Sequence, residues 1–280
     1  MRGMVIDSHH HFWAYSGREY GWISQEMATI RRDFLPPHLR EVTQQAGVDG
    51  VISVQARQSL DETRWLLEMA GENDFIRGVV GWVPLIAEDV RDHLAGFAAN
   101  RKLRAVRHVV QDEPDDRYLL REDFNRGIRA LREFDLRYDI LIYERHLPQT
   151  IEFVDRHPGQ VFILDHVAKP KIKSRQIEPW RTGIRELARR ANVYCKVSGM
   201  VTEAHWHLWR EEDLRPYWES ALEAFGTARL MAGSDWPVCL VACGYEQWWE
   251  IIRGWTALLS KGERARVLGE TAVEAYALEG

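Results

Sequence analysis

Two histidines near the start of the chain, His9 and His11, have a type and a spacing that suit catalysis. They end a short β-branched run, and residues two positions apart on a strand point to the same face, so both imidazoles can aim at one point. This arrangement suits a divalent metal ion, or a pair of donors that grip one oxygen atom. Asp235 lies in the polar segment 233–237, directly after the apolar run 230–232. If the two strand ends meet in space, these three side chains form an active site.

Polar side chains also end most of the other predicted strands. In a closed parallel barrel the carboxyl ends of all strands converge on one mouth, and a barrel built only for stability needs few polar residues there. His166 is therefore a further catalytic and metal-ligand candidate, beside His9, His11 and Asp235. The candidates for substrate binding are Gln55, Arg57, Arg107, His108, Tyr143, Lys169 and Lys196, together with three tryptophans whose rings can stack on a ligand, Trp13, Trp82 and Trp236.

Each candidate also has a purely structural interpretation. His9 and His11 could be a buried pair satisfied by backbone groups, and Asp235 could turn the chain before a proline, a common position for aspartate. Their predicted convergence on one mouth favours function. Arg107 and His108 are consecutive, so they face opposite ways and only one of them points into the barrel. The sequence does not decide which.

Short apolar runs alternate with longer amphipathic stretches along the chain, in eight strand-then-helix units. Such units imply parallel strands joined by right-handed crossovers, and eight of them imply a closed barrel. We therefore predict a (β/α)8 TIM barrel, with residues 1–280 as a single domain. A doubly wound open sheet is the competing architecture, but no Gly-x-Gly-x-x-Gly motif follows a predicted strand. After the opening strand, the expected strands are 51–55, 79–83, 105–110, 140–143, 161–164, 193–197 and 230–232. The expected helices are 37–46, 60–70, 90–99, 124–134, 151–156, 184–191, 214–225, 248–259 and 263–278.

Two connections in this scheme are unusually long, 12–35 and 199–213. Both follow a predicted strand, so both lie on the carboxyl-terminal rim of the barrel, where loops carry function. His205 and His207 lie in the second of them, outside any predicted strand, and we expect them to face solvent or to belong to a lid.

The composition limits the classes of partner. The chain has 280 residues, a formal charge of −5 and no dense lysine and arginine stripe, which argues against a nucleic-acid ligand. No apolar run approaches the length of a membrane span, so no membrane partner is expected. The three cysteines are an odd number without metal-ligand or redox spacing, which indicates a reducing, cytoplasmic location. A homo-oligomer is compatible with the sequence but is not readable from it.

The opening segment Ile-Asp-Ser-His-His-His-Phe-Trp, residues 6–13, resembles the amidohydrolase superfamily. Further matching segments span almost the whole chain in order and are specific to the sugar- and aryl-lactonase branch, which contains fuconolactonase-like, rhamnonolactonase-like and muconolactone-hydrolase-like enzymes. The resemblance implies a (β/α)8 barrel and hydrolysis of a lactone or a similar cyclic ester. These segments are 54–56, 62–67, 81–83, 107–114, 165–170 and 233–239.

Lactone hydrolysis needs a nucleophilic water, an electrophile on the carbonyl oxygen and a proton for the leaving alkoxide. We expect Asp235 to act as the general base and then to return the proton to the ring oxygen. The electrophile is either one divalent metal, with Zn²⁺ favoured, on His9, His11, Asp235 and His166, or the histidines acting with an arginine without metal. The strand-four lysine and strand-five histidine of binuclear amidohydrolases are missing, so a two-metal bridge is not expected.

The sequence leaves the substrate open. The cationic candidates favour an acidic muconolactone-type substrate, whereas the tryptophans suit a sugar lactone equally well. Two other functions compete with the lactonase: a non-hydrolytic decarboxylase of the related amidohydrolase branch, and a non-catalytic barrel that only binds a small ligand.

Overall fold

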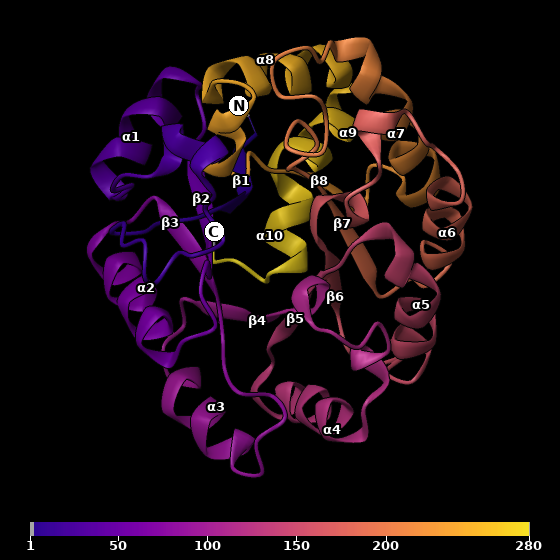
Figure 1. Ribbon diagram of the computed structural model, residues 1–280. Coiled ribbons are helices and arrows are strands. Elements are labelled where there is room, and N and C mark those ends of the chain that lie inside the picture. The colour runs from indigo at the N-terminus through magenta and orange to yellow at the C-terminus, as the bar shows by residue number, and fades with distance from the viewer. Residues whose placement is uncertain (1–2, 280) are drawn as a thin grey trace.

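The computed structural model describes residues 3–279 and contains eight parallel strands in the order β1 to β8, arranged as a ring with helices around it (Figure 1). The predicted (β/α)8 barrel is confirmed. The strands are β1 Ile6–His10, β2 Gly50–Val54, β3 Ile76–Gly81, β4 Leu103–Val109, β5 Arg137–Leu141, β6 Phe162–Leu164, β7 Val193–Val197 and β8 Leu230–Ala232. The helices are α1 Pro36–Gln45, α2 Leu60–Glu72, α3 Val90–Ala98, α4 Glu122–Leu131, α5 Leu147–Asp155, α6 Trp180–Leu187, α7 Glu211–Phe225, α8 Tyr245–Thr256, α9 Lys261–Ala265 and α10 Thr271–Ala275.

The strands are short apolar runs because both faces of a barrel strand are covered. One core layer lies between the sheet and the outer helices. A second, smaller core fills the inside, where Ile6, Ile52 and Met231 pack with Tyr276, which directly follows α10. In Figure 1, α10 lies across the centre of the ring, and it fills the end of the barrel at which β1 begins. The polar strand ends therefore open at the opposite mouth.

An irregularity in β1 decides which histidines enter the barrel. The pairing of β1 with β2 shifts between Asp7 and His10, so β1 has one extra residue there. Such a bulge re-aims the side chains that follow it. His9 and His11 consequently face the interior, whereas His10 bonds to Ser53 Oγ at 2.8 Å on the outer face.

The barrel closes where β8 meets β1. The backbone N–H of Asp235 donates to the carbonyl of His9 at 2.8 Å, and the N–H of His11 donates to the carbonyl of Trp236 at 2.7 Å. These bonds place the Asp235 carboxylate beside the two imidazoles, although the residues come from opposite ends of the chain.

Asp7 stabilises this junction between β8 and β1, the seam of the barrel, from the outer face. Its buried carboxylate accepts hydrogen bonds from Ser234 N at 2.8 Å, Ser234 Oγ at 2.6 Å, the Tyr245 hydroxyl at 3.0 Å and His9 N at 3.1 Å. Burial raises the pKa of Asp7 to about 6, and the donors oppose that rise, so the group is ionised at neutral pH. One carboxylate thus joins the end of β8, the start of α8 and β1.

The last predicted helix, over 263–278, is wrong as a single element. It is divided into α9, a π-helical turn at Arg266–Glu270, and α10. Gly269 in this turn lies against the carbonyl of Met4, where a Cβ would stand 2.0 Å from the oxygen. The π-helical turn therefore lies where the chain packs closely against the segment just before β1.

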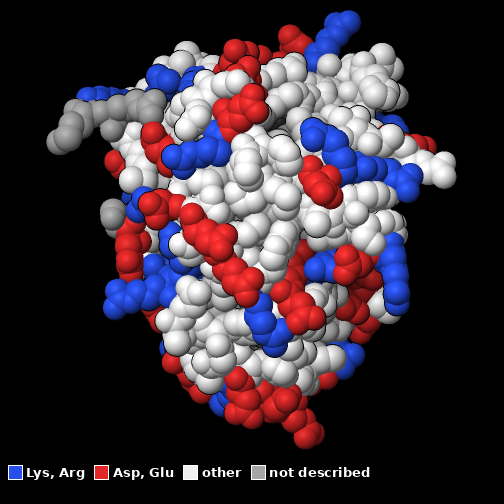
Figure 2. All heavy atoms as spheres, turned by 90° about the vertical axis from the view of Figure 1, so that its left-hand side faces the viewer, with Lys and Arg blue, Asp and Glu red and all other residues white. Residues whose placement is uncertain are grey.

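Within residues 3–279, no helix is long and apolar enough to cross a membrane. On the face drawn in Figure 2, basic and acidic side chains are interspersed, and that face presents no continuous basic surface.

We expect Asp7→Asn to lower the free energy of unfolding by about 2–3 kcal/mol, because the new amide group would turn N–H donors toward the donors that now bind the carboxylate. Urea denaturation at neutral pH measures the difference. Asp61→Asn is the control, since its side chain is 88% exposed, and it should change stability by less than about 0.5 kcal/mol. Equal stability of Asp7→Asn and the wild type would show that the seam does not need this carboxylate.

Candidate active site

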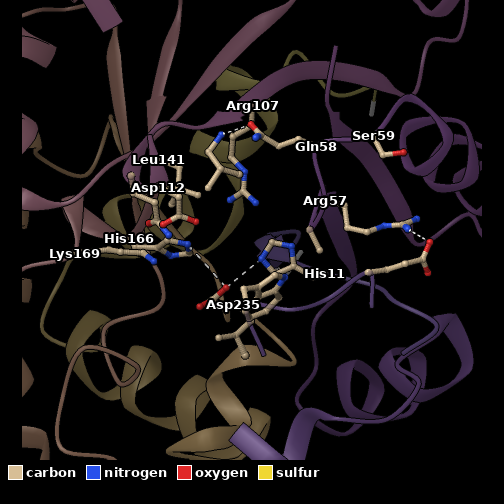
Figure 3. A pocket seen from close by; sticks show the side chains of 16 residues that line it. His11, Arg57, Gln58, Ser59, Arg107, Asp112, Leu141, His166, Lys169 and Asp235 are labelled. Carbon is tan, nitrogen blue, oxygen red and sulfur yellow. Dashed lines mark hydrogen bonds and ion pairs between the residues drawn. The ribbon is translucent and has the colours of Figure 1, made fainter. Parts of the chain in front are cut away.

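Four predicted catalytic residues meet at the mouth of the barrel. His9 Nε2 lies 3.2 Å from His11 Nε2, and Asp235 Oδ1 lies 3.3 Å from His11 Nε2 and 3.8 Å from His9 Nε2. His166 Nε2 approaches the same carboxylate oxygen at 3.9 Å. Figure 3 shows His11, His166 and Asp235 pointing toward one another in the pocket. The tertiary structure thus places the two ends of the chain around one small space.

The hydrogen positions on the two β1 imidazoles restrict what can lie between them. His11 Nδ1 is 2.8 Å from the carbonyl of Val54, which only accepts, so His11 donates there, and a neutral His11 ring presents the lone pair of Nε2 to the cavity. That lone pair faces His9 Nε2. A proton on His9 or a cation shared by both nitrogens is needed at that point.

The geometry fits one divalent metal. His9, His11 and Asp235 form a group whose ligand atoms all lie within 4.8 Å of one another. Four tetrahedral ligands at the usual zinc distances stand about 3.3 Å apart, close to the two shortest separations observed here. His9 Nδ1 lies 3.3 Å from Asp165 Oδ1, and a hydrogen bond to that carboxylate would leave His9 Nε2 free as a ligand.

A buried charged layer supports His9 from below. Lys196 Nζ lies 2.7 Å from Asp139 Oδ2, 2.9 Å from Asp165 Oδ1 and 3.1 Å from His9 Nδ1. The Tyr276 hydroxyl donates to Asp139 at 2.6 Å. Lys196, Asp139 and Asp165 have no exposed surface, so their charges can be stable only through these contacts. The layer fixes the His9 ring and leaves Lys196 out of the cavity.

Arg107 faces the interior, which settles the choice that the sequence left open. Its Nη1 donates to Asp165 Oδ2 at 3.0 Å and its Nη2 donates to Gln55 Oε1 at 2.7 Å. His108 points outward, where its Nε2 contacts Glu113 at 2.6 Å. The cause is the alternation of side chains along β4.

His166 lies on a strained turn after β6. It and the next three residues, through Lys169, have φ between 47° and 61°, a left-handed conformation that is costly for residues other than glycine. The turn is held by Trp180, whose Nε1 donates to the carbonyl of Val167 at 2.6 Å. His166 Nδ1 contacts Ser198 Oγ at 2.9 Å. This conformation allows both His166 and Lys169 to reach the cavity.

Burial and neighbouring charges set the protonation states. Burial lowers the pKa of His166 to about 4, and burial, followed by the charge of Lys196, lowers the pKa of His9 well below its usual range. Burial opposes the ionisation of Asp235, but His166 and His11 outweigh it and hold its pKa below the ordinary value. At neutral pH the site therefore contains neutral His9 and His166 facing an ionised Asp235.

A cavity of about 550 Å³ opens above this cluster. Of the residues predicted from the sequence, the structure places six in its lining: His11, Arg57, Arg107, His166, Lys169 and Asp235 (Figure 3). His9 lies directly beneath them. The structure does not place the other predicted substrate contacts, Trp13, Gln55, Trp82, His108, Tyr143, Lys196 and Trp236, in the lining.

These seven residues have other positions. Trp13 and Trp236 are buried and pack against Phe34 with ring centroids 5.6 and 5.0 Å away. Gln55 and Lys196 bind the charged groups below the cavity. Trp82 Nε1 donates to His108 on the outer face, and the Tyr143 ring lies beside Lys169. A position just past a strand end identified the region but not the direction of each side chain.

The sequence did not single out several residues that shape the site. Trp22 and Glu19 line the cavity from the loop after β1, Asp112 lines it from the short 3-10 helix Val110–Asp112, and Asp139 lies below it. The loop residues have no periodic pattern that would place them. Asp139 does carry a signal, because a carboxylate inside an apolar strand needs a buried partner.

The barrel and the cluster of imidazoles and carboxylates at its mouth are of the amidohydrolase type. The chain belongs to the Amidohydrolase family, which it matches over residues 6–278. Two relatives are named L-fucono-1,5-lactonase. The protein from Burkholderia multivorans is 41% identical over 99% of this chain and 97% of its own length, and that from Burkholderia ambifaria is 36% identical over 98% and 96%.

Solved structures agree with this assignment. A crystal structure of an amidohydrolase from Burkholderia multivorans with bound zinc superposes with a TM-score of 0.95 at 41% identity and covers 99% of this chain and 100% of that chain. A 2,6-dihydroxybenzoate decarboxylase from Rhizobium has a TM-score of 0.70 at 12% identity and shows the fold alone. The predicted lactonase branch is confirmed, and the decarboxylase alternative has only distant relatives.

Glu62 is a buried carboxyl on α2 that accepts hydrogen bonds from the backbone N–H groups of Ala56 and Arg57 at the cavity wall. We expect its ionisation to make the free energy of unfolding depend on pH. Burial raises its pKa from 4.5 to about 7. Between these values the folded protein keeps a proton that the unfolded chain has released. The contribution of Glu62 to the free energy of unfolding therefore falls as the pH rises from about 4.5 to 7.

We expect the stability difference between Glu62→Gln and the wild type to shift in favour of the variant across this range, by an amount on the order of 2–3 kcal/mol. Urea denaturation at the two ends of the range measures it. A pH-independent difference would contradict the raised pKa.

Proposed function

We propose that this protein hydrolyses the ring ester of a neutral sugar-acid lactone, with the six-membered L-fucono-1,5-lactone as the representative substrate. The observation that carries the proposal is the ionised Asp235 carboxylate facing the His9 and His11 nitrogens inside a cavity large enough for one sugar ring. The names of the two relatives support the same substrate class.

The chemistry follows from the protonation states. Asp235 accepts a proton from a water molecule as that water attacks the lactone carbonyl carbon. The tetrahedral intermediate then collapses, the bond from carbon to ring oxygen breaks, and the proton passes from Asp235 to the alkoxide. The products are the free sugar acid and a regenerated site. Arg107, His166 and Lys169 line the cavity and can donate to the carbonyl oxygen or to ring hydroxyls.

His9, His11 and Asp235 would hold one divalent metal, with His166 beside them. We propose Zn²⁺, since two neutral imidazoles and one carboxylate are a donor set that zinc accepts, and a structure of the Burkholderia multivorans amidohydrolase carries that ion. When bound, such an ion polarises a carbonyl and lowers the pKa of water. The proton steps at Asp235 are the same with or without it.

The charges around the cavity favour a neutral substrate over an acidic one. Each cationic residue of the lining has an acidic partner: Arg57 with Glu19 at 2.5 Å, Arg107 with Asp165 at 3.0 Å, and Lys169 with Glu203 at 3.9 Å. A muconolactone-type carboxylate would have to displace one of these partners, whereas hydroxyl groups can bond to the existing pairs. The cytoplasmic location stays a prediction from the sequence, which does not determine the oligomeric state.

We expect Asp235→Asn to reduce lactone hydrolysis by a factor of about a thousand or more, because the amide cannot accept the proton of water. Proton release from L-fucono-1,5-lactone measures the rate. Asp112→Asn, a second carboxylate of the same cavity, is the control and should lose less than about tenfold. Full activity of Asp235→Asn would exclude it as the base, and no hydrolysis of any sugar lactone by the wild type would refute the proposed function.

Metal removal tests the zinc assignment. We expect the purified protein to contain about one zinc per chain, and His11→Asn to hold at least about tenfold less metal, because one of three ligands is lost. Elemental analysis after dialysis measures the content. His205→Asn, in the rim loop outside the cluster, should keep the wild-type content. Full activity of the metal-stripped wild type would contradict a metal role and leave the lactonase proposal intact.

A further inference from the structure

Trp22 is an exposed tryptophan on the wall of the cavity, and none of the mechanistic steps above uses it. Its side chain is 43% exposed, while most large apolar side chains of residues 3–279 are buried. Among the described residues that line the cavity, it is the one phenylalanine, tyrosine or tryptophan. Exposed indole surface at the mouth of a binding site is apolar area that a ligand can cover.

The position of Trp22 is fixed by contacts that lead to the catalytic cluster. Its ring meets the edge of Trp13 at 5.7 Å and 87°. Trp13 is fully buried, donates through Nε1 to the carbonyl of Arg32 at 2.9 Å, and stacks toward His11 at 6.5 Å and 26°. Trp22 therefore lies one ring beyond Trp13, on the same side of the cavity as His11.

The loop that carries Trp22 is anchored at both ends and in the middle. Trp13 and Phe34 exchange backbone hydrogen bonds of 3.0 and 2.8 Å, which close the loop at its base. Glu19 pairs with Arg57 after β2, and the Tyr20 ring lies under the Arg57 guanidinium at 5.2 Å. The indole is thus held at the mouth before any ligand arrives, and little ordering is needed on binding.

Apolar groups of the lining accompany the indole. Val238, Leu141 and Ala56 contribute hydrocarbon to the lining, while the cations and carboxylates provide its polar contacts. A sugar lactone has a matching division, with hydroxyl groups on its edges and C–H bonds on its faces. A lactone of a deoxy sugar acid adds a methyl group, which gains free energy when it is buried against such a wall.

We propose that Trp22 is a specificity-determining residue, which packs on the carbon face and the methyl group of the lactone and so selects deoxy sugar lactones over their hydroxymethyl counterparts. This inference rests on the proposed function and names the substrate class within it. An additional hydroxyl against the indole would lose its water without gaining a partner, which gives the modest discrimination that an apolar wall can provide.

The test compares L-fucono-1,5-lactone with the same lactone carrying a hydroxymethyl group in place of the methyl. We expect the wild type to prefer the methyl compound by about tenfold in kcat/KM. Trp22→Ala should raise KM for the methyl compound by about tenfold, change kcat by less than about threefold, and reduce the preference below about threefold. Trp22→Phe keeps an aromatic face and should retain most of the preference.

Leu208→Ala is the control, because Leu208 is 70% exposed, lies in the other rim loop and is outside the cavity lining. It should behave as the wild type. An unchanged KM and preference in Trp22→Ala would overturn the inference while lactone hydrolysis persists. If the wild type opened no lactone, the proposed function would fail. Calorimetric binding of the ring-opened acid, L-fuconate, would then test the role of Trp22. About tenfold weaker binding to Trp22→Ala would support the inference, and equal binding to the variant and the wild type would overturn it.

Discussion

The hydrogen-bonded seam between β8 and β1 is the constraint on which the site depends. Backbone bonds across it set Asp235 against His9 and His11, and the Asp7 carboxylate joins the same two strands to α8 from behind. A buried carboxylate that accepts only hydrogen bonds, without a cation among those contacts, tolerates little displacement of its donors. The same few residues therefore close the barrel and bring the candidate catalytic groups together.

The second constraint is the charged layer beneath His9. Taking Lys196, Arg107, Asp139 and Asp165 out of water costs free energy, which their mutual contacts offset, and replacing such buried ion pairs by apolar residues of equal volume is often neutral or stabilising. The presence of these four charged residues is explained better by the positioning of the His9 ring than by a gain in stability. Asp165 contacts both cations and the imidazole of His9, so this carboxylate shares with Asp139 in balancing the charge and also orients the His9 ring. Strain at His166 and Lys169 is a cost of the same kind, accepted where side chains must enter the cavity.

Much of the fold was predictable because barrel strands are buried on both faces and so form short apolar runs between amphipathic helices. The cluster of candidate catalytic residues was predictable for the same reason, since most such runs end in a polar side chain. The aromatic side chains that reach the cavity were not predictable from the sequence. Trp13 and Trp236 follow strand ends as predicted but turn into the core, whereas Trp22, on an irregular loop, is the tryptophan that reaches the cavity. Residue propensities and hydrophobic periodicity predict helices and strands. The direction of a side chain in a loop depends instead on its contacts with residues distant in the sequence.

The sequence by itself determined the number and order of the strand and helix units, the chemistry available at the strand ends, and the family to which the chain belongs. Only the tertiary structure decided that a bulge in β1 turns His9 and His11 inward, that Arg107 rather than His108 enters the barrel, and that each cation of the cavity has an acidic partner. The physical reason is that a pattern along one segment records which residues can be buried. The direction of a side chain and the state of its charge depend on the atoms packed around it, and those atoms come from other strands.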